Sequence, residues 1–487
     1  MNPVRKSKID KDIEESPLEP IHQFLTGQKA KIWVPARWGP SNGMNRRNLM
    51  KHLGFGATLG ALGFLGKSSE AVAEKYSKAT KGLPSLKITS VKSILTAPQR
   101  IRLCVVKVQT SEPGLYGLGC ATYNQRPLPV AVAVDKYLDP FAKGRDVDNI
   151  EDLWQNAYTS SYWRNGPVLN NTLSGLDQAL WDIKGKRANM PVYQLLGGKC
   201  RFAVDCYTHC GGRDLKQLEN SVRRAMEQGF RHIRIQLGGY GSPHLSKEPH
   251  FKDAGFGLPS DSHMDARPYL NAVPRMFEHI RNTCGDEVEL LHDIHERIPP
   301  IDAINLVKEL EQYHPFFIED PFPPEAIGYF KMLRQQTSVP IAMGELFNNP
   351  HEWLGLISER LIDFIRVHIS QVGGLSVARK IAALGEWFDV RSAWHGPGDV
   401  SPVGHAANAH LDLAISNFGI QESVRFSQKT REVFSGCPTI ENGYMFVNEA
   451  PGFGVDIDEN LAAKFPLPEH PGYWSPVRRS DGTAVRP

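Results

Sequence analysis

Three acidic residues stand at the ends of short apolar runs in the middle of the chain. They are Asp293, Glu319 and Glu345, and each is separated from the next by 26 residues. That interval is about one strand, one helix and their loops, so parallel strands would bring the carboxylates to one edge of a barrel. Neighbouring carboxylates repel each other by about 4 kcal/mol per pair at an effective dielectric of 20. A hard divalent cation, Mg2+ before Zn2+, relieves that repulsion. The alternative interpretation is that the acids are helix N-caps.

The elements that position these acids follow a strand–helix alternation over residues 201–422. Eight apolar runs with seven helical intervals predict an α/β fold, a (β/α)8 TIM barrel whose last helix is reduced or lost, or (β/α)7β. Residues 85–200 begin with β-rich runs and continue with helical patterns, which predicts a small α+β domain. The eight runs are 202–208, 232–237, 289–293, 316–319, 340–343, 364–366, 391–394 and 420–422.

Composition excludes several classes of protein. The 487 residues are 41% hydrophobic and 22% charged, which excludes a disordered chain and a polytopic membrane protein. The net charge is +3, but residues 1–73 hold 11 Lys/Arg and 6 Asp/Glu, so the remainder carries −2. A slightly acidic chain after residue 73 does not have the excess of basic residues that is typical of nucleic-acid-binding proteins. Seven scattered cysteines suggest no disulfide framework, and Cys206, His209 and Cys210 lack a fourth ligand for zinc.

The N-terminal region has the pattern of an export signal at residues 44–73. Arg46-Arg47 precedes the apolar run 53–65, and Ala71-Val72-Ala73 forms a small-x-small cleavage site. This layout predicts twin-arginine export to the periplasm, with a cytoplasmic location if the signal is not used. The apolar run is too short to span a bilayer, so we expect no stable membrane insertion after signal removal. Residues 1–43 are a disordered extension or precede the true start at Met44. An amphipathic N-terminal helix is the alternative interpretation.

Longer motifs add a family resemblance over residues 86–483. Together with the acid triad, they resemble the mannonate dehydratase group of the enolase superfamily, which includes proteins called starvation-sensing. The resemblance implies that Asp293, Glu319 and Glu345 hold Mg2+. It also implies that residues 85–200, with the C-terminal segment 423–487, form a capping domain over the barrel. The motifs are Tyr162-Trp163-Arg164-Asn165-Gly166-Pro167, Ala179–Lys186, Pro191–Gly198, His292-Asp293-Ile294-His295, Glu319-Asp320-Pro321, Gly344–Asn348, Trp394-His395-Gly396, Asn417–Glu422 and Gly452–Ile457.

The resemblance also suggests which residues transfer protons. His295 lies two residues past Asp293, so strand alternation would point both side chains to one face. It resembles the family's general acid, although a surface histidine is the alternative. Arg234 resembles the arginine that activates a tyrosine base. Tyr240, six residues later, is the candidate base; otherwise it is a loop tyrosine whose ring packs while its hydroxyl meets solvent.

Six further polar residues match the family's substrate contacts. The first two come before or after the first barrel strand, and the others lie at the ends of strands six to eight. Each has an alternative interpretation as a helix cap or a structural ion pair. The residues are Asn124, His209, Arg366, His395, Asp399 and Glu422.

The implied reaction is Mg2+-dependent dehydration of an acid sugar of the D-mannonate or D-gluconate type. It yields a 2-keto-3-deoxy acid through an enediolate. A metal-containing acid-sugar sensor with little turnover and an epimerase of a related hydroxy acid remain as alternatives. Arg366 on strand six argues against the epimerase, which needs bases on both faces of the substrate. Closed symmetric assemblies are the default for such enzymes, so we expect a homo-oligomer.

Overall fold

The computed structural model describes residues 83–238, 262–469, 477–479 and 481–486. The predicted export signal, the extension 1–43 and Tyr240 lie outside the described residues. Residues 84–487 form one compact unit. Within the described residues, no helix combines the length and the apolar character needed to cross a membrane.

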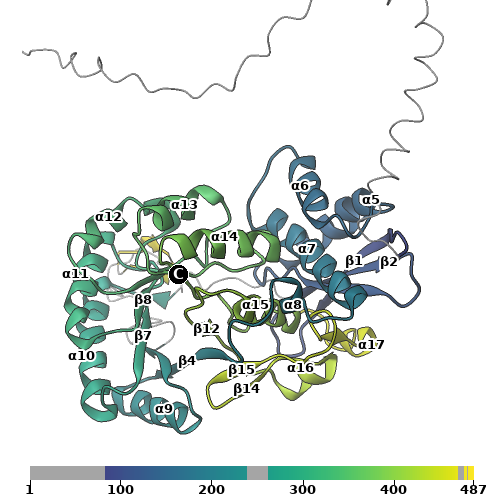
Figure 1. Cartoon of the computed structure of the whole chain (residues 1–487). Helices are drawn as coiled ribbons and strands as arrows, with labels where there is room; N and C mark the ends of the chain where they lie inside the picture. The colour runs from purple at the N-terminus through teal and green to yellow at the C-terminus, as the bar shows by residue number, and fades with distance from the viewer. Residues whose placement is uncertain (1–82, 239–261, 470–476, 480, 487) are drawn as a thin grey trace, which may run out of the picture. The chain divides into compact units, whose positions relative to one another are not determined.

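The N-terminal part of this unit is an antiparallel sheet covered by helices (Figure 1). Strands β1 (Ile88–Thr96), β2 (Leu103–Thr110) and β3 (Tyr116–Cys120) pair in sequence order. Helix α7 (Pro167–Ala188) packs directly on β3, where a Cβ at Gly119 would lie 2.1 Å from the Gly175 carbonyl oxygen. The other helices here are α4 (Pro127–Ala133), a π-helical turn (Val134–Leu138), α5 (Asp139–Ala142), α6 (Ile150–Ser160) and α8 (Val192–Leu195).

The second part is a parallel barrel, which confirms the predicted fold class. Strand β12 pairs with β4 and residue 392 bridges to residue 418, so the ring closes. Among the described residues, one helix of α9 to α15 lies between each barrel strand and the next. After β12 the chain leaves the barrel without an eighth helix of this kind, which gives the (β/α)7β pattern. The strands are β4 (Val204–Gly212), β5 (His232–Leu237), β7 (Glu289–Asp293), β8 (Phe317–Glu319), β9 (Ile341–Met343), β10 (Phe364–Ile365), β11 (Arg391–Ser392) and β12 (Gln421–Glu422). The helices are α9 (Leu215–Glu227), α10 (Ala266–Cys284), α11 (Pro300–Leu310), α12 (Tyr329–Arg334), α13 (Pro350–Ser358), α14 (Leu375–Trp387) and α15 (Pro402–Ala414), with 3-10 turns at Glu311–Tyr313 and Pro324–Ala326.

A small apolar cluster fills the barrel interior. Its members come from the strands or from the residues next to them, and all are fully buried. Inward-pointing side chains of a closed barrel pack in layers, so they make a core and not a pore. This layer therefore supports the polar side chains at the strand ends. The cluster consists of Tyr207, Leu291, Phe317, Ala342, Phe364, Ala393 and Ile420.

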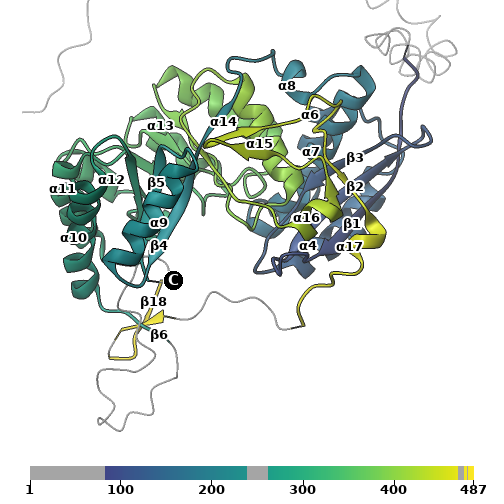
Figure 2. The same ribbon diagram turned by 90° about the horizontal axis from the view of Figure 1, so that it is seen from below.

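After the barrel the chain returns first to the N-terminal sheet and then to the barrel. Glu459 at the start of helix α17 (Glu459–Ala462) forms ion pairs with Lys92 and Lys107 of β1 and β2. Figure 2 shows α17 beside β1, the strand that it contacts. The remaining C-terminal elements are α16 (Gln428–Val433), β13 (Phe434–Ser435), β14 (Thr439–Glu441), β15 (Tyr444–Phe446), β16 (Asp456–Ile457), β17 (Val477–Arg478) and β18 (Ala484–Val485), and β17 pairs with β6 (Ser262–His263).

Candidate metal centre and active site

Two of the predicted metal ligands meet at the carboxyl ends of neighbouring strands. Asp293 ends β7 and Glu319 ends β8, and the two residues are paired in the parallel register. Both are buried, with exposed fractions of 1% and 0%. Oxygen atoms of Asp293, Glu319 and Asp320 lie within 4.8 Å of one another. The barrel therefore gathers three carboxylates where its two adjacent strands end.

The donor set of this cluster fits a hard divalent cation. Both oxygens of Asp293, Oε2 of Glu319 and Oδ2 of Asp320 are buried and accept no hydrogen bond from any described residue. Unpaired buried carboxylate oxygens are costly because they have lost their hydration. Mg2+ prefers carboxylate and water oxygens in an octahedral shell. These oxygens would thus hold the ion, with Asp293 and Glu319 as its central ligands.

Asp320 is a member of this cluster that the sequence did not reveal. Consecutive residues of a strand point to opposite faces, so an Asp320 that continued the strand would turn away from Glu319. Instead its backbone leaves β8 with a left-handed φ of 41°. The Gly344 amide then donates to its Oδ1 at 3.2 Å. The signal available in the sequence was only the position of Asp320 directly after a predicted ligand.

Glu345 is held beside the cluster by three cationic or protonatable side chains. Its Oε2 lies 2.6 Å from Nη1 of Arg366 and 3.2 Å from Nδ1 of His395. Its Oε1 lies 3.4 Å from Nε2 of His295. Burial opposes ionisation, but these neighbours hold the pKa of Glu345 well below its usual value. Glu345 is therefore an ionised side chain on the same wall, and its predicted role as the third Mg2+ ligand stays a prediction.

Two buried arginines lie beneath the acids and offset their charge. Nη1 of Arg234, on β5, is 2.8 Å from Oε1 of Glu319 and 3.3 Å from Oδ2 of Asp293. Nη2 of Arg366 is 2.9 Å from the same Glu319 oxygen and 2.6 Å from Oε2 of Glu422. Buried charges persist only when they are paired and hydrogen-bonded. The predicted role of Arg234 in activating Tyr240 stays a prediction, because Tyr240 lies outside the described residues.

His295 reaches the cavity by a route that differs from the predicted one. Strand β7 ends at Asp293, and His295 has a left-handed φ of 55°, so simple strand alternation does not apply. The side chain still lines the cavity and faces Glu345. Burial lowers the pKa of His295, but Asp293 and Glu345 more than offset this and raise it to about 9. These two carboxylates therefore favour the protonated form of the imidazole.

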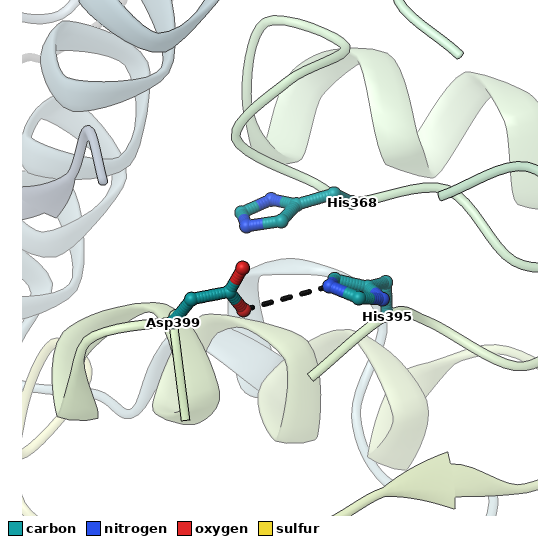
Figure 3. Close-up of side chains that lie close together, drawn as sticks. All are labelled: His368, His395 and Asp399. Carbon is teal, nitrogen blue, oxygen red and sulfur yellow. Dashed lines mark ion pairs between the residues drawn. The ribbon is translucent and has the colours of Figure 1, made fainter. Parts of the chain in front are cut away.

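His395, Asp399 and His368 form a second cluster of potential ligands (Figure 3). Nε2 of His395 is 3.5 Å from Oδ1 of Asp399, and the two imidazole rings are 5.3 Å apart. The Ser370 amide donates to Nδ1 of His368 at 3.2 Å. Neutral His368 therefore carries its proton on Nε2, which cannot then ligate a metal. We interpret this cluster as a polar wall in which His395 and Asp399 form an ion pair, and not as a second metal site.

Five of the six predicted substrate contacts line one cavity of about 960 Å³. Nε2 of His209 and Oε1 of Glu422 are 2.7 Å apart within it. Arg366 does not line the cavity: it is fully buried below the carboxylates and donates to the Tyr207 hydroxyl. The sequence also missed Arg102, Gln236, Gln371 and Arg486 as lining residues. The lining combines Asn124 from the N-terminal sheet region with His209, Arg234, Asp293, His295, Glu345, His395, Asp399 and Glu422 from the barrel.

Comparisons with known proteins agree with this architecture. Residues 83–197 match the N-terminal domain of the mandelate racemase / muconate lactonizing enzyme family. Residues 217–461 match the enolase C-terminal domain-like family. The chain is 51% identical over 421 residues to a D-galactonate dehydratase family member from Salmonella enteritidis, covering 83% of this chain and 99% of that one. A member from Pantoea ananatis is 52% identical over 423 residues, with 83% and 100% covered.

Solved structures give the same result. The crystal structure of an enolase from Pantoea ananatis with bound D-gluconate and Mg superposes with a TM-score of 0.79 at 52% identity. It covers 82% of this chain and 100% of that chain. A structure from Zymomonas mobilis, at 27% identity, has a TM-score of 0.68 and covers 78% and 98%.

Proposed function

Because the chain belongs to the D-galactonate dehydratase family of the enolase superfamily, we propose that it dehydrates a six-carbon acid sugar with the aid of Mg2+. The substrate is of the D-gluconate or D-mannonate type, and the product is the 2-keto-3-deoxy acid. The observation that carries this proposal is the set of buried carboxylate oxygens of Asp293, Glu319 and Asp320 that accept no hydrogen bond from a described residue and lie beside a polar cavity. The D-gluconate and Mg in the relative from Pantoea ananatis support the same chemistry.

The reaction removes a proton from C2 and a hydroxyl group from C3. A proton next to a carboxylate is weakly acidic, and bound Mg2+ supplies the positive charge that stabilises the resulting enediolate. The acids of the cluster hold the ion, and Arg234 and Arg366 fix the acids through the contacts given above. The chain itself thus supplies a preorganised anionic site whose side chains need not move during the reaction.

Two protein groups are needed for the proton transfers. We assign the general acid to His295, which lies two residues beyond the end of β7, lines the cavity and can protonate the departing C3 hydroxyl as water. We assign the base to Tyr240, which takes the C2 proton. The enol formed after loss of water tautomerises to the 2-keto acid. His209 and Glu422, hydrogen-bonded to each other, face the cavity and can bind hydroxyl groups.

Turnover of a panel of acid sugars tests the proposal. The purified protein with Mg2+ is incubated with D-gluconate, D-mannonate and D-galactonate, and 2-keto acid is measured. We expect 2-keto-3-deoxy acid from at least one sugar, loss of activity with EDTA, and recovery with added Mg2+. Glu319→Gln removes a charged ligand and is expected to abolish turnover, whereas Glu309→Gln on the outer helix α11 is the matched control.

Other outcomes would select another function. Tight, Mg2+-dependent binding of a sugar without any keto acid would refute the dehydratase and favour a sensor. Solvent deuterium at C2 of recovered sugar, again without keto acid, would favour an epimerase. Tyr240→Phe with unchanged turnover would eliminate Tyr240 as the base.

We also propose that the protein is exported through Arg46-Arg47, which precede the apolar run. Fusion of residues 44–73 to a reporter that folds in the cytoplasm tests this. Periplasmic reporter is expected, and replacement of both arginines by lysine is expected to leave the reporter in the cytoplasm. Equal export of the two fusions would refute the twin-arginine route.

A further inference from the structure

Arg486 lies close to the C-terminus and lines the same cavity as Asp293 and His295. It follows β18, which pairs antiparallel with β17, and β17 pairs in parallel with β6. Figure 2 shows β18 and β6 in the same part of the molecule, and β17 lies between them in this sheet. Backbone hydrogen bonds of a three-stranded sheet therefore position the residue that carries this guanidinium.

Two acids from the loops after β7 and β8 flank the Arg486 side chain. Its Nε is 3.7 Å from Oε2 of Glu296, and its Nη2 is 3.9 Å from Oε2 of Glu325. Glu296 is nearly buried, with 10% of its side chain exposed, whereas Arg486 is 50% exposed. The guanidinium is thus held at the exposed rim of the cavity, while Asp293 lines its buried part.

The hydrogen-bonding capacity of Arg486 is not used by these neighbours. Both ion-pair distances are longer than a hydrogen bond, and no described residue accepts one from this guanidinium. A guanidinium has five N–H donors in a planar fork that suits carboxylate and paired hydroxyl oxygens. A cavity of about 960 Å³ also leaves room for a long substrate to extend from the floor to the rim.

We propose that Arg486 is a specificity-determining residue that binds the end of the acid sugar remote from the reacting carboxylate. This inference rests on the proposed function, because the ligand is the same acid sugar. Glu296 and Glu325 keep the guanidinium over the cavity mouth, and its donors bind the terminal oxygens. The contact favours six-carbon acids over four-carbon ones, and it accommodates a second carboxylate at the remote end.

Substrate length is the variable that separates binding from a structural role. We compare Arg486→Gln with the native protein on D-gluconate and on the four-carbon acid D-erythronate, both with Mg2+. A lost charge-assisted hydrogen bond predicts about a tenfold rise in KM for D-gluconate. The KM for D-erythronate and both kcat values stay within about twofold, since the shorter acid does not reach the rim. Arg486→Lys, which keeps the charge, is expected to be intermediate.

The matched control is Arg479→Gln. Arg479 belongs to the same C-terminal segment, is exposed and does not line the cavity. It should leave the KM for both acids unchanged. An unchanged KM for D-gluconate in Arg486→Gln would overturn the inference. Equal losses for the two acids would overturn it as well, because they would show that Arg486 only fastens the C-terminal segment.

The inference and the proposed function fail in different ways. If the native protein converts none of the acids, the proposed function is refuted. The inference is then judged from Kd values for the same two acids, measured by calorimetry with Mg2+. A D-gluconate affinity that falls about tenfold in Arg486→Gln, with the D-erythronate affinity unchanged, supports it without turnover. An unchanged ratio of the two affinities overturns it.

Discussion

Asp177 on helix α7 caps another helix, α14, and its environment makes unfolding free energy depend on pH. The Ser376 amide donates to its Oδ2 at 2.9 Å, and the Ser376 hydroxyl donates to its Oδ1. A helix N-terminus favours a carboxylate, yet Asp177 is only 1% exposed. Burial outweighs the hydrogen bonds and raises the pKa of Asp177 from 3.8 to about 7.

The raised pKa of Asp177 determines whether the unfolding free energy rises or falls with pH. A carboxyl whose pKa is higher in the folded than in the unfolded protein stabilises the fold below its unfolded pKa, and this stabilisation is lost as pH rises through the folded pKa. A rise from 3.8 to about 7 corresponds to at most about 4 kcal/mol of unfolding free energy, lost between roughly pH 4 and pH 7. Asp177→Asn cannot ionise, so the variant lacks this slope.

Chemical denaturation from pH 4.5 to pH 7.5 measures the effect as the difference between the native protein and Asp177→Asn. We expect the variant to gain stability relative to the native protein as pH rises. A constant cost of the amide substitution shifts every point equally and leaves the slope intact. Asp286→Asn, at a side chain that is 93% exposed, is the control and should show no slope. A difference between native protein and Asp177→Asn that is independent of pH would refute the reasoning.

Two further predictions concern the metal centre and the general acid. Asp320→Asn should weaken Mn2+ binding, followed by electron paramagnetic resonance, by about tenfold because it removes one charged oxygen donor next to the ion. Asp302→Asn on helix α11 is the control and should not weaken Mn2+ binding. Equal Mn2+ affinities of Asp320→Asn and the native protein would show that Asp320 takes no part in metal binding. His295→Asn should reduce keto-acid formation at least about 100-fold while exchange of the C2 proton with D2O continues, since only the departing hydroxyl needs this acid. Loss of both reactions to the same extent, measured by NMR, would contradict the assignment of His295 as the general acid.

The barrel was predictable because the strand–helix repeat is visible in the pattern of apolar residues. Apolar runs of strand length alternate with helical patterns, and Asp293 and Glu319 are the last residues of two such runs. Parallel strands then leave only one edge on which both carboxylates can lie. The convergence of these two acids therefore follows from spacing alone.

The side-chain partners within the site were not predictable in this way. Asp320 enters the cluster through a left-handed backbone, and His295 reaches the cavity through another, and neither conformation has a sequence signal such as glycine. Arg366 was expected on the cavity wall, but four carboxylates compete for it below the wall. The positions of these side chains depend on all the charges buried around them, and the spacing of residues in the sequence does not reveal those charges. Arg486 was missed because a distant strand pair brings it back to the barrel.

The position of Arg366 also bears on which reaction the site can perform. Its Nη1 contacts Glu345 and lies 3.0 Å from Nδ1 of His395, while Nε2 of His395 faces Asp399. Both ring nitrogens of His395 therefore have partners. Epimerisation needs a second base on the substrate face opposite the first, whereas dehydration needs one base and one acid. Because Arg366 and Asp399 occupy His395 on both sides, this wall offers no second base, and the geometry favours loss of water over inversion at C2.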